Sequence, residues 1–369
     1  MMQKTMMALA LAGLSFNAAA DVTLYGQIKS SVSASQVKIK GANGTDKSAT
    51  ATRINDNTSR LGFKGSEKLD GDTQAIWQLE QRVSILGDST NWGSRDSFIG
   101  LEGQFGKIRA GNMNNLLNEM DTIDTWMSTP TATDLRVFTR TGSRTTSVRY
   151  DSSKVADFQL NLQYSPRDNQ NPADKYAHKE PGRDQYNIGL TYSRPEYFAK
   201  LAYNLRKNRV GKEDGHIVRL ETAYDANNLF LGLGAQYAKA NESANGYLDK
   251  FLDGYKQYNG TDINAGSEAV KVIDMAVTAG YNFGNLRPRI SYAHGWPAKG
   301  VNSGEKLVDK FDQVIVGGDY RFSKRTALRG QVAYMRVGGN TTLYTDGSGQ
   351  AQKGKVEQTA ATLGLHHRF

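Results

Sequence analysis

The sequence has no cysteine among its 369 residues and only 7 prolines. Without cysteine the chain can form neither a disulfide framework nor a thiolate metal site. After residue 20 no run approaches the roughly 18 consecutive apolar residues that a transmembrane helix needs, and the mean hydropathy is −0.57. These absences exclude a helical membrane protein. They do not exclude a membrane β-barrel, because its strands face lipid on one side and water on the other.

The first twenty residues have the features of a secretion signal. Lys4 supplies one cation, an apolar stretch runs from Met6 to Phe16, and residues 18–20 are the small residues that suit signal-peptidase cleavage. We therefore expect residues 1–20 to be cleaved and residues 21–369 to form the folded domain. An exported chain without disulfides favours the bacterial envelope. The formal net charge of the full chain is +9.

Apolar residues after residue 20 recur with a period of two. Val22, Leu24 and Ile28 alternate with polar neighbours, and residues 158–164 and 186–192 repeat the pattern. Sixteen such segments predict an all-β chain, and an even number of strands can close into an antiparallel barrel without a free edge. Their centres lie near residues 27, 62, 78, 99, 108, 148, 161, 189, 201, 220, 233, 277, 290, 316, 331 and 363.

The links between these segments alternate between short and long. Tight turns on one side and long loops on the other are typical of an outer-membrane barrel. The turn-like links lie at residues 193–196, 225–228, 283–286 and 322–325. The long links lie near residues 35–57, 112–142, 165–184, 239–269, 295–311 and 337–355.

Eight segments carry motifs: 21–26 (DVTLYG), 60–65 (RLGFKG), 75–81 (AIWQLEQ), 97–101 (SFIGL), 105–109 (FGKIR), 147–151 (SVRYD), 289–295 (RISYAHG) and 367–369 (HRF). Together they resemble the trimeric general porins of the neisserial and other β-proteobacterial type, and the match covers most of the chain. The resemblance implies a 16-stranded antiparallel transmembrane β-barrel, assembled in threes, whose third external loop folds inward. It implies passive passage of ions and small hydrophilic solutes across the outer membrane, without enzymatic activity.

The resemblance also implies partners in the cell envelope. The expected partners are outer-membrane lipid, lipopolysaccharide and two further copies of the chain. The last strand ends at Phe369 and resembles the signal that the barrel-assembly machinery recognises. No nucleic acid is expected, because Lys and Arg are spread along the strands with Asp and Glu among them.

Residues 112–142 form the loop that is expected to fold inward. Within it, apolar residues at helical spacing favour a short helix that rests on the barrel wall while carboxylates between them face the lumen. A surface loop with scattered acids is the alternative. The apolar residues are Leu116, Leu117, Met120 and Ile123, and the acids are Glu119, Asp121 and Asp124.

The wall opposite this loop is expected to carry basic residues at the pore constriction. Facing positive and negative walls create a transverse field at the narrowest point. Arg95 is included in the expected set because it lies in a family-like stretch of sequence. Strand alternation, however, puts its side chain on the same face as Ile99 and Leu101. The candidates whose parity matches the polar side of a strand are Lys29, Arg60, Arg82, Lys107, Arg109 and Arg149. The basic balance favours a modest anion preference, which the loop acids can reverse.

Two other functions stay open on the sequence alone. The first is a barrel enzyme, for which His216 and His294 are the only plausible bases. The second is an adhesin or receptor with a blocked lumen, although no plug-sized segment is present. His366 and His367 are neighbours in a strand and point to opposite faces, so they make a poor metal site. We expect neither a metal nor a cofactor.

Overall fold

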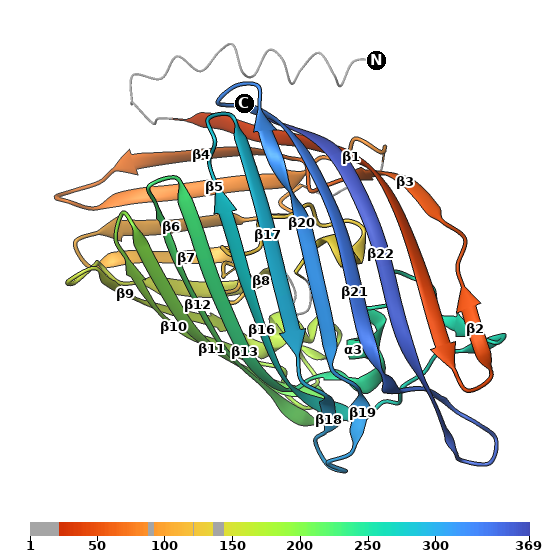
Figure 1. The fold of residues 1–369 in the computed structure, drawn as a ribbon. Helices are drawn as coiled ribbons and strands as arrows, with labels where there is room; N and C mark the ends of the chain where they lie inside the picture. The colour runs from red at the N-terminus through yellow and green to blue at the C-terminus, as the bar shows by residue number, and fades with distance from the viewer. Residues whose placement is uncertain (1–21, 88–91, 121, 136–143) are drawn as a thin grey trace, which may run out of the picture.

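A computed structural model describes residues 22–87, 92–120, 122–135 and 144–369. The segment interpreted as a secretion signal, residues 1–20, lies outside this range. The described chain forms a β-barrel whose 20 strand segments hydrogen-bond into a single sheet (Figure 1). The start of the first strand and the C-terminus lie near one end of the barrel, and the short strands of the loops lie near the other.

Sixteen strands make up the barrel. The interrupted second strand consists of β3 (Ala51–Asp56) and β4 (Arg60–Lys68), which both pair with β1 (Thr23–Gly41). The short strands β2 (Gly44–Lys47), β18 (Ala298–Gly300) and β19 (Lys306–Val308) extend the loops. The other barrel strands are β5 (Gln74–Arg82), β6 (Ser97–Gly103), β7 (Gly106–Asn114), β8 (Arg144–Asp151), β9 (Phe158–Ser165), β10 (Gln185–Ser193), β11 (Tyr197–Val210), β12 (Glu213–Ala226), β13 (Leu229–Ser243), β16 (Ala269–Tyr281), β17 (Leu286–Gly295), β20 (Phe311–Arg321), β21 (Thr326–Thr345) and β22 (Ala351–Arg368).

The barrel closes between its first and last strands. β1 pairs antiparallel with β22 from Gln27 opposite Arg368 to Gly41 opposite Gly354. At the end of this seam the backbone N–H of Gly26 donates to the carbonyl of Phe369 over 3.1 Å. A Cβ on Gly26 would lie 2.5 Å from the Phe369 ring, so glycine permits this close approach. The prediction of a closed 16-stranded antiparallel barrel is confirmed, and each predicted strand centre lies within one barrel strand.

The two faces of the sheet have opposite chemistry. Val32, Leu220 and Val316 point outward and are 54%, 42% and 45% exposed, whereas Gln236 and Gln331 point inward and are buried. This pattern is the reverse of a soluble barrel, because lipid covers the outer face and polar groups line the lumen.

Two predicted loops are largely strand. The link near residues 35–57 contains the end of β1 together with β2 and β3, and the link near 337–355 contains the ends of β21 and β22. The β1–β22 ladder continues to the pair of Gly41 and Gly354. These extensions escaped the sequence pattern because beyond the lipid band strands no longer need an apolar outer face.

The segment between β13 and β16, residues 244–268, packs inside the long-loop end of the barrel. It contains α3 (Ala244–Asp249) and the small hairpin of β14 (Gln257–Tyr258) and β15 (Thr261–Asp262). Tyr247 and Phe251 are buried, and the Phe251 ring lies 5.1 Å from that of Phe311 on β20. The main apolar cluster of the protein therefore lies within the barrel.

The remaining helices are short. They are α2 (Arg167–Gln170), η1 (Thr131–Thr133) and η2 (Pro172–Asp174). Among the described residues, no helix is both long enough and apolar enough to cross a membrane.

Candidate pore lumen and constriction

The described part of the connection between β7 and β8, residues 115–135 without residue 121, runs inside the barrel. We call it the inward loop. Gln313 of β20 donates to the carbonyls of Ala132 and Asp134 over 2.7 and 2.9 Å. Gln331 of β21 donates to the carbonyl of Met127 over 2.9 Å. Because inward side chains of the wall hold its backbone, the predicted inward position of this loop is confirmed.

The apolar side of the inward loop rests on the wall as predicted. Leu116, Leu117, Met120 and Ile123 are all buried. A Cβ at Gly232 of β13 would lie 2.6 Å from Cγ2 of Ile123, so glycine lets the loop lie directly on the strand.

The predicted short helix is wrong. Residues 116–119 form a turn, and the residues described after it are irregular up to η1. The loop's carbonyls accept hydrogen bonds from the wall: Leu117 from Arg219 over 3.1 Å and Ile123 from Thr278 over 2.9 Å. These contacts occupy carbonyls that a helix would use within its own backbone.

Two charged residues of β12 anchor the loop, and the sequence analysis missed both. Arg219 is fully buried, and its Nε and Nη2 donate to Oε1 of Gln236 over 3.0 and 2.8 Å. Oε2 of Glu221 accepts from the backbone N–H and the hydroxyl of Thr122 over 3.1 and 2.6 Å. Both alternate along β12 with the outward Val218 and Leu220, and this alternation was the available signal.

One acid of the inward loop contacts a basic residue of the wall. Oε1 of Glu119 lies 2.6 Å from Nη1 of Arg149 on β8. Nη2 of Arg149 also lies 2.9 Å from Oδ1 of Asp151, which pairs with Arg109 as well. Lys107 lies 3.2 Å from Glu102. The loop therefore joins the wall through an existing network of charges.

The cations nearer the long-loop end of this wall also have carboxylate partners. Nε of Arg60 lies 3.4 Å from Oε2 of Glu80, and Nη2 of Arg82 lies 3.5 Å from Oδ2 of Asp56. On the inner face of β4–β8, seven cations contact carboxylates, and we call them with their partners the paired wall: Arg60, Arg82, Arg95, Lys107, Arg109, Arg144 and Arg149.

The side chain of Arg95 lies on the opposite face from the one that strand alternation predicted. Its parity with Ile99 predicted an outward side chain, yet its Nε lies 2.5 Å from Oε1 of Glu80 inside the barrel. β6 begins only at Ser97, so strand alternation does not extend back to Arg95.

The comparisons with known proteins decide the family. A family model described as Gram-negative porin matches residues 5–340. The major outer membrane protein P.IB of Neisseria sicca is 38% identical over 395 residues, and that of Neisseria lactamica is 34% identical over 381, with all of each chain covered. The chain belongs to the Gram-negative porin family. It is a diffusion porin of the bacterial outer membrane that lets ions and small hydrophilic solutes pass.

Solved structures share the fold of this porin. An anion-selective porin from Comamonas acidovorans has a TM-score of 0.68 and 20% identity, with 95% of this chain and 100% of that chain covered. The trimer form of OmpT from Vibrio cholerae has a TM-score of 0.63 and 13% identity, with the same coverage. Short turns face the periplasm in such barrels, which orients the lumen.

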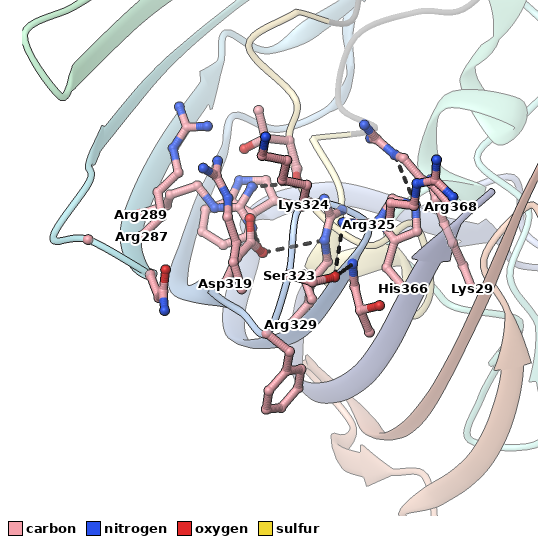
Figure 2. A pocket seen from close by; sticks show the side chains of 18 of the residues that line it. Lys29, Arg287, Arg289, Asp319, Ser323, Lys324, Arg325, Arg329, His366 and Arg368 are labelled. Carbon is pink, nitrogen blue, oxygen red and sulfur yellow. Dashed lines mark hydrogen bonds and ion pairs between the residues drawn. The ribbon is translucent and has the colours of Figure 1, made fainter.

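A cavity of the porin at this periplasmic end was not predicted. It has a volume of about 860 Å³ and is lined by the turns at Gly284 and Ser323 and by the inward loop at Asp124 (Figure 2). We call it the basic mouth. Its cations are Lys29, Arg287, Arg289, Arg321, Lys324, Arg325, Arg329 and Arg368, and its carboxylates are Asp124 and Asp319.

The few carboxylates of the basic mouth are shared. Oδ1 of Asp319 lies 2.8 Å from Nη2 of Arg289 and 3.4 Å from Nε of Arg329. Arg289 also lies over the ring of Trp126 in the inward loop, 4.5 Å from its centroid. Within the described part of the chain, Lys29, Arg287 and Arg368 have no carboxylate within 4.0 Å. The positive charge of this mouth is therefore largely uncompensated.

The structure separates the predicted site residues into two groups. Arg60, Arg82, Lys107, Arg109 and Arg149 face the lumen, as parity predicts. Lys29 and Asp124 belong to the basic mouth, and Asp121 lies outside the described residues. The sequence analysis missed most of this mouth because its residues come from both ends of the chain. Arg287 and Arg289 alternate with the outward Ile290, which was a usable signal.

Proposed function

We propose that this porin has a modest preference for anions and that the basic mouth sets it. The observation that carries the proposal is the excess of eight Lys and Arg side chains over two carboxylates around one water-accessible cavity. Fixed charge at a pore entrance raises the local concentration of counter-ions and so favours their entry. The name of the Comamonas acidovorans protein, an anion-selective porin, supports the same preference.

The constriction is proposed to lie where the inward loop meets the paired wall. The contact between Glu119 and Arg149 joins the loop to the wall there. Because the other wall cations also contact carboxylates, this region sets the width of the passage more than its charge. The proposed constriction residues are Arg60, Arg82, Arg95, Lys107, Arg109, Arg149, Glu119 and Asp121, with Lys29 and Asp124 at the mouth beside them.

The proposal includes assembly and envelope partners. The assembly is a homotrimer, in keeping with the family and with the trimer form of the Vibrio cholerae relative in fold. Residues 1–20 are a cleaved secretion signal, and the strand that ends at Phe369 is read by the barrel-assembly machinery. Phosphorylated lipid of the outer leaflet surrounds the barrel.

The proposal assigns no catalytic activity to the chain. The two histidines considered as bases point away from the lumen and bond to outward side chains. Nδ1 of His216 lies 2.8 Å from the hydroxyl of Tyr203, and Nδ1 of His294 lies 2.8 Å from Oδ1 of Asp312. A hydrolase assay with ester and peptide substrates should give no activity above that of the H216A/H294A variant.

Current through single channels in a planar bilayer tests the pore proposal. A trimer should close in three steps of about equal size, and the zero-current potential in a salt gradient should have the sign of an anion-preferring pore. A single closing step would overturn the trimer. A potential of the cation sign would overturn the role of the basic mouth while leaving the diffusion pore intact.

A further inference from the structure

Four lysines lie side by side on the outer surface near the long-loop end of the barrel. Lys239 of β13 is opposite Lys271 of β16, Lys271 is opposite Lys299 of β18, and Lys299 is opposite Lys306 of β19. The strand neighbours Ala238, Val272 and Ala298 are buried on the inner face, which fixes the outward direction of Lys239, Lys271 and Lys299. Lys306 is exposed and reaches the same row through a register shift between β18 and β19. We call these four residues the lysine row.

The lysine row lies just beyond the edge of the apolar band. Tyr237 and Ile273 are opposite each other, and each lies two positions closer to the membrane than the lysine of its own strand. The backbone N–H of Trp296 donates to the carbonyl of Ile273 over 3.0 Å. These three side chains point outward and are 41%, 49% and 43% exposed. Tyrosine and tryptophan lie at the membrane–water interface, so the lysines stand at the level of lipid headgroups, about 7 Å further out.

The charge of the lysine row is not compensated by the described protein. No carboxylate of the described residues lies within 4.0 Å of its four ammonium groups. Lysines at the rim of β1 and β22 differ, because Nζ of Lys40 lies 3.1 Å from Oε2 of Glu357 and Lys355 pairs with Glu357 as well. Like charges directly opposite each other destabilise a sheet, so an external anion would stabilise this row.

We propose that the lysine row binds the phosphate groups of a glycolipid headgroup in the outer leaflet. A lysine ammonium binds phosphate as a compact point charge, and a row of them suits a headgroup that carries more than one phosphate. The interfacial residues Tyr237 and Trp296 lie beneath it, where the headgroup meets the acyl chains. This inference rests on the outer-membrane location and gives a site to the lipid partner named above.

Lipid fits this row better than a neighbouring protein subunit does. A subunit seam would remove four unpaired ammonium groups from water, which is costly without partner carboxylates. The row also faces away from the lumen, so it cannot serve the permeating solutes. The headgroup layer offers phosphate and water together.

The test compares the variant K239Q/K271Q/K299Q/K306Q with the matched control K175Q/K179Q/K212Q/K353Q. The control removes the same charge from exposed lysines elsewhere at the long-loop end. The purified porin is titrated with bisphosphorylated lipid A, and bound lipid is counted by native mass spectrometry. We expect the row variant to bind about tenfold more weakly than the wild type and the control to match the wild type.

Further measurements distinguish a site for lipid phosphate from adsorption of acyl chains and from a site for free phosphate. Dephosphorylated lipid A should bind the wild type as weakly as bisphosphorylated lipid A binds the row variant, and inorganic phosphate should not displace the bound lipid. Equal lipid binding by the row variant and the wild type would overturn the proposal. So would binding that survives dephosphorylation or that inorganic phosphate abolishes. Heat-dependent gel mobility checks that each variant is a folded barrel.

The pore proposal and the lipid proposal fail in different experiments. Because the lysine row faces lipid, the zero-current potential of the row variant should equal that of the wild type. A wrong sign of that potential in the wild type would count against the basic mouth and leave lipid binding untouched.

Discussion

The paired wall and the basic mouth both place arginine and lysine side chains on the lumen, yet carboxylates compensate their charge to very different degrees. On the paired wall, Arg60 and Arg95 share Glu80, and Arg82 contacts Asp56. At the basic mouth, eight cations surround two carboxylates. The position of the carboxylates, and not the number of cations, therefore decides where the lumen is electrically positive.

This difference has a structural origin. The inward loop contacts the paired wall, where Glu119 meets Arg149. Charges that must pack at close range need partners, because leaving one unpaired in a confined site is costly. The basic mouth opens to water between short turns, where solvent screens like charges.

The largest expected effect comes from removing uncompensated cations. The variant K29Q/R287Q/R368Q should lower the anion-to-cation permeability ratio about threefold, because these residues have no carboxylate within 4.0 Å in the described chain. Zero-current potentials in a KCl gradient measure this ratio. An unchanged ratio would show that the basic mouth does not set the preference. The variant K175Q/K179Q/K212Q, which removes three exposed cations from the long-loop end, is the control.

The second effect concerns the anchor of the inward loop. E221A removes the acceptor of two hydrogen bonds from Thr122 and should free the loop at a cost of about 1–3 kcal/mol. We expect greater open-channel noise in bilayer recordings. E196A, at an exposed turn residue, should leave the noise unchanged. A quiet E221A channel would mean that the other wall contacts hold the loop without β12.

A smaller effect is expected at the contact between loop and wall. E119Q removes one negative charge and weakens the 2.6 Å contact with Arg149. The zero-current potential should move slightly in the anion direction, because Arg149 then keeps only Asp151 as a partner. The same recordings measure the shift. A shift in the cation direction would contradict the assignment of Glu119 to the lumen.

The smallest effect is expected when both members of a wall pair become neutral. R82Q/D56N removes one positive and one negative charge that lie 3.5 Å apart, so the permeability ratio should stay at the wild-type value. R82Q alone should lower the ratio, because the charge of Asp56 then remains. If the double variant lowered the ratio as much as R82Q, the pairing would have no electrical role.

The barrel was predictable because its physics is local. Each strand shows the alternation of outward apolar and inward polar residues in its own sequence, so the sixteen strand centres could be found one at a time. Closure followed from the need to satisfy backbone groups in lipid. The inward side of Lys29, Arg60 and Arg149 followed from the same alternation.

The lumen was harder to predict because its residues meet across the barrel. Lys29 and Arg368 join Arg287 only when the first and last strands pair. Strand alternation predicts which face of the sheet a side chain lies on. It predicts neither how far along the barrel axis the residue lies nor which carboxylate it contacts. The predicted helix failed for a related reason, since the wall's side chains hold the carbonyls of Leu117 and Ile123. Arg95 failed because it precedes its strand.

The position of the uncompensated charge can be tested in one bilayer by reversing the salt gradient. Fixed charge is screened less in dilute salt, so it acts most strongly when the dilute solution bathes it. With the dilute solution at the periplasmic side, the zero-current potential should have the anion sign and be larger than with the gradient reversed. Equal potentials in both directions, or a larger one with the dilute solution outside, would contradict a preference set at the basic mouth.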